Sequence, residues 1–173
     1  SALSAKFADN LLDATQAWTY HITPENKGLL DGLPNHLIEL GKETADEQKK
    51  IGWVFGLDHP TYYSILSYAK NKELRKEFYV AYNTRASDQG PTAGQWDNSS
   101  VMVEILKIRQ EIARMLGYAN FAEYSLVPKM ATSVQQVNKF LQDLVKKARP
   151  QAEQEFSRLR EFAAQRGHHG ALE

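Results

Sequence analysis

The stretch VMVEILKIRQEIARMLG, residues 101–117, decides the fold class of this chain. Apolar side chains recur along it every three or four residues, which is the spacing of one face of an amphipathic helix. Asp97 or Asn98 can cap the start of the helix, and Gly117 offers the left-handed backbone that often follows its end. The pattern therefore predicts a helix over about 97–117. Its apolar face consists of Val101, Ile105, Ile108, Ile112 and Met115.

The sequence after this helix predicts two more helices. Asn120 with Glu123, and Ser133 with Gln136, match the capping box, in which the cap and third side chains satisfy free backbone donors reciprocally. The second helix runs past Pro150, which removes one helical hydrogen bond and clashes with an earlier carbonyl. We therefore predict a kink or a short break at this proline.

Two helices and a loop are predicted before the central helix. A cap at Asp58 and an apolar stripe predict helices over about 60–70 and 71–86. Residues 87–96 read SDQGPTAGQW, and their glycines and proline exclude ladder or helix hydrogen bonds. We predict a mobile loop that Trp96 anchors at its far end, and we favour a plain connector over a gate.

The first third of the chain mixes helices with two short strands. An apolar stripe predicts a helix over 2–14, and alternating side chains predict strands at about 16–22 and 52–57. A polar helix over about 35–49 lies between the strands, and such a crossover would allow parallel pairing. The first helix has no N-cap and the chain has no initiator Met, so we expect the sequence to begin inside a longer helix.

The predicted class is mainly α: one multi-helix domain over residues 1–173 with at most two short β-strands, at about 16–22 and 52–57. Its 173 residues, 42% of them hydrophobic, are enough to bury one core. The 21 Lys and Arg balance 21 Asp and Glu, so no global field would attract nucleic acid or an anionic membrane. No apolar run approaches the roughly 20 residues of a membrane span. The lack of cysteine fits a reducing compartment, which predicts a cytoplasmic protein.

The histidines do not form a zinc motif. A zinc peptidase needs two histidines one helical turn apart, a glutamate that activates water, and a further carboxylate ligand. No two histidines of this chain are four residues apart. We predict structural or solvated roles for all of them, and no catalytic, cofactor-binding or metal-binding residue. The five histidines are His21, His36, His59, His168 and His169.

Other chemistries also lack their residues. No serine lies in a Gly-x-Ser-x-Gly elbow, and Gly90 and Gly94 have no phosphate-loop lysine beside them. Acidic residues alternate with the basic residues over 109–161, which favours a solvated mixed-charge surface over a nucleic-acid site. Aromatic residues at helical spacing are predicted to pack in the core or between helices. They are Tyr62, Tyr63, Tyr68, Phe78, Tyr79 and Tyr82.

Several short motifs occur in an order that resembles a known family. The stretch LRKEFYVAYNTRASDQGP, residues 74–91, is followed by WDN at 96–98 and by VMVEIL at 101–106. Gly32-Leu33-Pro34 precedes it, and Leu116-Gly117-Tyr118, Lys129-Met130-Ala131 and Ala148-Arg149-Pro150 follow it. Each motif alone is weak. Together, over essentially the whole chain, they resemble the thimet oligopeptidase family of zinc metallopeptidases.

The resemblance implies a larger, mostly helical enzyme whose two lobes border a deep channel with a single zinc at its floor. Short peptides enter such a channel and folded proteins do not. The family's zinc motif would lie beyond Glu173, so this chain would be a scaffold segment of the channel-wall lobe, inactive alone. Its partner would be the remainder of the peptidase. The alternative is a stand-alone, non-catalytic helical interaction module.

Two apolar stripes would then lack the parts that cover them in the whole enzyme. One lies on the helix over 2–14 and the other on the helix over 133–166. Each large side chain left in water forgoes about 1.5–3 kcal/mol of burial. We therefore expect self-association through these stripes or fraying of the terminal turns. The stripes are Leu3, Phe7 and Leu11, and Phe156, Leu159 and Phe162.

Overall fold

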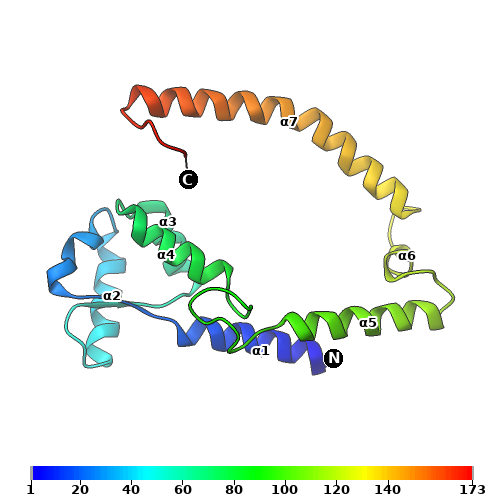
Figure 1. The fold of residues 1–173 in the computed structure, drawn as a ribbon, viewed down its shortest axis with the longest axis horizontal. Coiled ribbons are helices and arrows are strands. Elements are labelled where there is room, and N and C mark those ends of the chain that lie inside the picture. The colour runs from blue at the N-terminus through cyan, green and yellow to red at the C-terminus, as the bar shows by residue number, and fades with distance from the viewer. Residues whose placement is uncertain (1, 173) are drawn as a thin grey trace. The chain divides into compact units, whose positions relative to one another are not determined.

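The computed structural model describes residues 2–172 and is mainly helical (Figure 1). This confirms the predicted class, and every predicted helix is present with bounds that differ by a few residues. The elements are α1 (Ala2–Ala17), β1 (Tyr20–Ile22), the 3-10 helix η1 (Pro24–Leu30), α2 (Asn35–Glu47), β2 (Trp53–Phe55), α3 (His59–Tyr68), α4 (Lys72–Asn83), α5 (Ser99–Met115), α6 (Phe121–Leu126) and α7 (Val134–Gln165).

The two strands pair antiparallel, so the parallel pairing that the sequence allowed is wrong. Tyr20 lies opposite Phe55, and Ile22 lies opposite Trp53. The connection is long enough for a parallel crossover, but its path through η1 and α2 returns β2 in the opposite direction.

The chain divides into two compact units, one up to Lys107 and the other from Ile108. In the first unit, β1, β2, α3 and α4 enclose a core, and α3 and α4 lie side by side (Figure 1). Trp18 packs edge-on against Phe78, with 5.0 Å between ring centroids. A Cβ at Gly41 of α2 would lie 2.6 Å from the Phe55 ring, so glycine lets α2 approach β2. The largest fully buried side chains are Phe55, Phe78, Ile22, Leu57, Ile65, Leu74 and Val54.

In the second unit, the forward hydrogen bond of both predicted capping boxes forms. Asn120 Oδ1 accepts from the Glu123 amide at 3.0 Å, and Ser133 Oγ accepts from the Gln136 amide at 3.1 Å. The return arms differ from the prediction, because they reach the residue before the cap. Glu123 Oε2 accepts from the Ala119 amide, and Gln136 Oε1 from the Thr132 amide, at 3.3 and 2.7 Å. Each box therefore also fixes the residue that leads into its helix.

The helix α7 is continuous through Pro150. Figure 1 shows its axis changing direction near the middle, so the proline produces a kink without a break. Phe156, Leu159 and Phe162 are 52%, 54% and 55% exposed, as the sequence predicted for this stripe. The stripe of α1 is different, because Leu3, Phe7 and Leu11 are already half-buried within the first unit.

Candidate functional site

Aromatic side chains of α3 and α4 form a stack beside the core of the first unit. The rings of Tyr62 and Tyr82 are 3.9 Å apart and inclined by 11°. The Arg85 guanidinium carbon lies 3.5 Å from the centroid of the Tyr82 ring. Because Tyr62 covers one face of that ring, Arg85 covers the other. The predicted packing role is confirmed for these tyrosines and for Phe78.

Three tyrosines with the same helical spacing do not pack as predicted. Tyr63, Tyr68 and Tyr79 are 61%, 54% and 55% exposed. Helical spacing places residues on a face, but it does not decide whether a neighbouring element covers that face. The Tyr63 ring stacks on the His59 ring, with 6.2 Å between centroids.

Arg85 connects the end of α4 to α1. Its Nε donates to the Tyr82 carbonyl at 2.8 Å, and its Nη1 donates to the Thr15 hydroxyl at 3.0 Å. Thr15 in turn donates to the Leu11 carbonyl at 2.7 Å. The guanidinium therefore stacks on the Tyr82 ring and donates a hydrogen bond to α1. These contacts tether the end of α4 to α1.

Asn98 forms a buried polar node at the start of α5. Its side chain is fully enclosed and donates from Nδ2 to the Phe7 carbonyl at 3.0 Å. Its Oδ1 accepts from Asn10 Nδ2 at 2.8 Å, and its backbone amide donates to the Ala86 carbonyl at 3.0 Å. The node joins α1, the segment at Ala86 and the start of α5, and the side-chain amide of Asn98 has both a donor and an acceptor partner. The sequence predicted only a cap here, and no local signal reveals partners so far away along the chain.

The loop over 87–96 contains neither helix nor strand, but turns hold it. The Gly94 amide donates to the Ser87 carbonyl at 3.0 Å, and the Ala93 amide donates to the Gly90 carbonyl at 3.2 Å. Trp96 is half-buried at the far end. Mobility of the tip stays a prediction.

The histidines lie in four separate parts of the chain, and only His168 and His169 are neighbours. His21 Nε2 is 2.9 Å from the Ile51 carbonyl oxygen, and His36 is exposed on α2. His59 begins α3, and His168 and His169 follow α7. Within residues 2–172, no group of three or more His, Asp or Glu side chains is placed to hold a metal ion.

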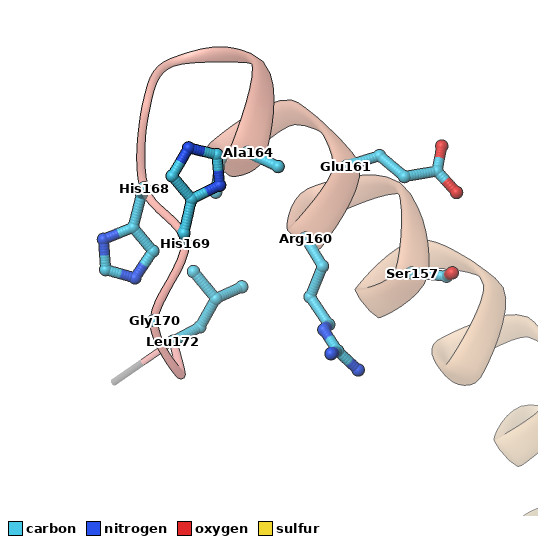
Figure 2. Close-up of a pocket in the computed structure, with 9 residues that line it drawn as sticks. Ser157, Arg160, Glu161, Ala164, His168, His169, Gly170 and Leu172 are labelled. Carbon is cyan, nitrogen blue, oxygen red and sulfur yellow. The ribbon is translucent and has the colours of Figure 1, made fainter.

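A hollow of about 370 Å³ lies where the tail folds back beside the end of α7 (Figure 2). Leu172 points into the space between tail and helix, and Arg160 extends along it. His168 Nε2 lies 3.1 Å from the Ala171 carbonyl oxygen, and the Glu161 carboxylate points away from the hollow. Among the described residues that line it, the hollow thus has basic groups and no carboxylate that faces them to form an acid and base pair.

Among the described residues, two carboxyl groups have lowered pKa values: Asp97, just before α5, and Glu25, at the start of η1. A hydrogen bond from the Ser99 side chain, followed by one from the Ser99 amide, lowers the pKa of Asp97. A side-chain hydrogen bond from Thr23 lowers the pKa of Glu25. A general acid needs a pKa raised toward neutrality, so these shifts have the opposite direction.

No helix within the described range, 2–172, is both long enough and apolar enough to pass through a bilayer.

Comparison with known proteins identifies the class. The chain is 48% identical over 163 residues to "Oligopeptidase A" of Salmonella typhimurium, covering 94% of this chain and 24% of that protein. It is 38% identical to "Probable cytosolic oligopeptidase A" and 37% identical to "Organellar oligopeptidase A, chloroplastic/mitochondrial", both of Arabidopsis thaliana. In each case 95% of this chain is covered, and 23% and 21% of the relative. The chain is thus related to peptidases, and it spans about a quarter of their length.

The particular family follows from the family comparison. The model of peptidase family M3 matches residues 65–173. The chain belongs to peptidase family M3.

Proposed function

We propose that this chain is a helical scaffold segment of an oligopeptidase A-like, zinc-dependent peptidase, and that it forms part of the lobe that walls the substrate channel. The observation that carries the proposal is the 48% identity to Oligopeptidase A over 94% of the chain. Because that match covers 24% of the relative, hydrolysis of short peptides is assigned to the longer polypeptide. The chain alone is inactive.

The zinc that this family chemistry implies does not fit the residues of this chain. Its five histidines include no pair with the spacing of a helical turn, and only the adjacent His168 and His169 share a segment. Zinc-activated water supplies the nucleophile in peptidases of this kind. We therefore assign the metal and the reaction steps to residues outside this chain.

The polar interior of the chain supports an architectural role. Thr61 and Asn98 are the only buried polar side chains among the described residues, and no buried side-chain polar atom there lacks a hydrogen-bond partner. Catalytic sites instead gather ionisable groups whose pKa values are perturbed by burial and by neighbouring charges. The contacts of Asn98 and Arg85 join elements to one another, as a scaffold requires.

We assign the parent enzyme to the cytoplasm. The absence of cysteine is typical of a reducing compartment, and one relative is named as probably cytosolic. Another relative is named as organellar, so fractionation of source cells with an antibody against this chain is the test. Recovery in an organelle would contradict the assignment.

The experiment on activity compares this chain with the polypeptide encoded by the whole reading frame. Both are assayed on a quenched fluorescent peptide, with and without a chelator, and zinc is measured by metal analysis. We expect chelator-sensitive turnover and zinc in the whole polypeptide, and neither in the chain alone. Turnover by the chain that survives repurification would contradict the proposal. A reading frame that stops near Glu173 would favour the interaction module.

A further inference from the structure

The apolar face of α7 is uncovered along most of the helix. None of residues 138–162 is buried. A contiguous exposed apolar face of this length marks a surface that another surface covers, because monomeric proteins rarely leave such patches in water. Six large side chains on this face are between 47% and 61% exposed: Phe140, Leu141, Leu144, Phe156, Leu159 and Phe162.

The kink of α7 gives this face a direction of curvature. Pro150 lies two residues from both Ala148 and Ala152, which are on the apolar face, so the proline is on the opposite side of the helix. A proline ring pushes away the preceding turn, and helices curve with their convex side toward solvent. The apolar face is therefore the concave one, which fits a rounded body.

One carboxylate interrupts the apolar face. Glu155 lies one turn before Leu159 and two turns before Phe162, in line with them. Its Oε1 accepts a hydrogen bond from Gln151 Nε2 at 2.8 Å, which is a neutral donor. Glu153 is different, because it lies off this face and pairs with Arg149 at 2.7 Å. A surface that covers Glu155 must compensate its charge, since burying an unpaired carboxylate is costly.

From the curvature and from Glu155, we propose that the concave face of α7 docks on a rounded apolar surface of the same peptidase polypeptide, and that this surface places a cationic side chain opposite Glu155. The inference rests on the proposed function, because 76% of the length of Oligopeptidase A (100% minus the 24% matched) lies outside the match. A second copy fits less well. If the α7 helices of two copies met face to face, their concave faces would leave a gap at the midpoints. Only the small side chains of Ala148 and Ala152 lie there, and they would not fill it.

The test measures native-state amide exchange of α7 in the whole polypeptide and in this chain. We expect residues 152–162 to exchange at least about 1,000-fold more slowly in the whole polypeptide, because docking must open before they exchange. Replacing Glu155 distinguishes a covering surface that has a cation opposite this residue from a covering surface that has none. Glu155→Leu should reduce this protection about 100-fold, since it leaves a buried cation unpaired. The matched control is Glu161→Leu, which makes the same change on the polar face and should alter protection by less than about threefold.

Several outcomes would overturn the proposal. Equal exchange in the two proteins would show that nothing covers α7, and greater protection in Glu155→Leu would show a covering surface without a cation. Protection in the chain alone that rises with its concentration would assign the face to a second copy. If Glu155→Leu does not fold, Glu155→Gln keeps the shape and should reduce protection about tenfold.

Peptide turnover by the unmodified whole polypeptide is measured in parallel. Turnover with an unprotected α7 would reject the docking and keep the proposed function. Protection of α7 without turnover would reject the function and keep the docking.

Discussion

The helices α4 and α7 have the same apolar spacing but opposite surroundings. In α4, Leu74 and Phe78 are 1% and 0% exposed, whereas Phe156 and Phe162 of α7 are 52% and 55% exposed. Amphipathic spacing gives a helix an apolar face, but that face is buried only where a neighbouring element packs against it. A helix pattern therefore locates a contact surface without identifying what lies against it.

The same contrast holds for the two compact units. Among the described residues from 108 onward, only Ala113 is buried, so the core of the chain belongs to the unit before it. Packing stabilises the first unit, whereas α7 depends on its cap and on exposed pairs such as Lys139 with Asp143, at 3.2 Å. Such exposed pairs contribute about 0–1 kcal/mol each.

Removing a ring from each helix tests this contrast most strongly. In this chain, Phe78→Ala should lower the free energy of unfolding by about 3–5 kcal/mol, because it creates a cavity against Trp18. Phe156→Ala, a matched change on an uncovered face, should alter it by less than about 0.5 kcal/mol. Urea unfolding followed by tryptophan fluorescence measures both. Equal losses would mean that the face of α7 is covered in solution, as in self-association.

The buried node should matter less than the core, but still measurably. Asn98→Ala leaves the Asn10 amide without its acceptor and removes the donor to the Phe7 carbonyl. We expect a loss of about 1–3 kcal/mol in the same urea experiment. Gln95→Ala, an exposed amide in the adjoining loop, is the control and should have no measurable effect. A loss below 0.5 kcal/mol for Asn98→Ala would show that water replaces these contacts.

The helix caps allow a finer comparison of the two units, because the capping side chain can be removed from one helix of each unit. Asn71 Oδ1 caps α4 through the Leu74 amide at 2.8 Å, and Ser133 Oγ caps α7 through the Gln136 amide at 3.1 Å. Asn71→Ala should lower global stability by about 1 kcal/mol. Ser133→Ala should instead accelerate amide exchange about fivefold at the start of α7 and leave the urea midpoint unchanged. A shift of that midpoint by Ser133→Ala would mean that α7 unfolds together with the core.

The smallest expected effect is the pH response of the carboxylate before α5. The pKa of Asp97 in the folded chain lies below its ordinary value of 3.8, chiefly because Ser99 Oγ donates to it at 2.6 Å. The resulting stabilisation is complete above the ordinary pKa and is lost as the pH falls through the lower folded pKa. Ser99→Ala should raise the pKa of Asp97 toward the ordinary value in a carboxyl NMR titration. An unchanged pKa would show that the amide bond alone causes the shift.

The local features of the fold could be predicted from the sequence, because caps, helical spacing and strand alternation act over a few residues. The helix α5 and both capping boxes are examples. The antiparallel pairing could not be predicted, because it depends on the path of the whole connection between the strands, which includes the irregular segment that forms η1. The exposure of Tyr63 and the node at Asn98 also depend on residues far along the chain. That no residue of this chain binds a metal, which the spacing of the histidines predicts, stays a prediction.

The node at Asn98 also constrains the order in which the chain can mature during synthesis. Asn98 follows Asn10 by 88 residues, and ribosomes add about 5–20 residues per second, so roughly 4–18 s separate the two. Throughout that interval α1 lacks its Asn98 contacts, and for most of it α1 also lacks the hydrogen bond from Arg85. Although α1 is synthesised before the elements that hold it, it is therefore among the last parts of its unit to be fixed, and its half-buried stripe is exposed in the meantime.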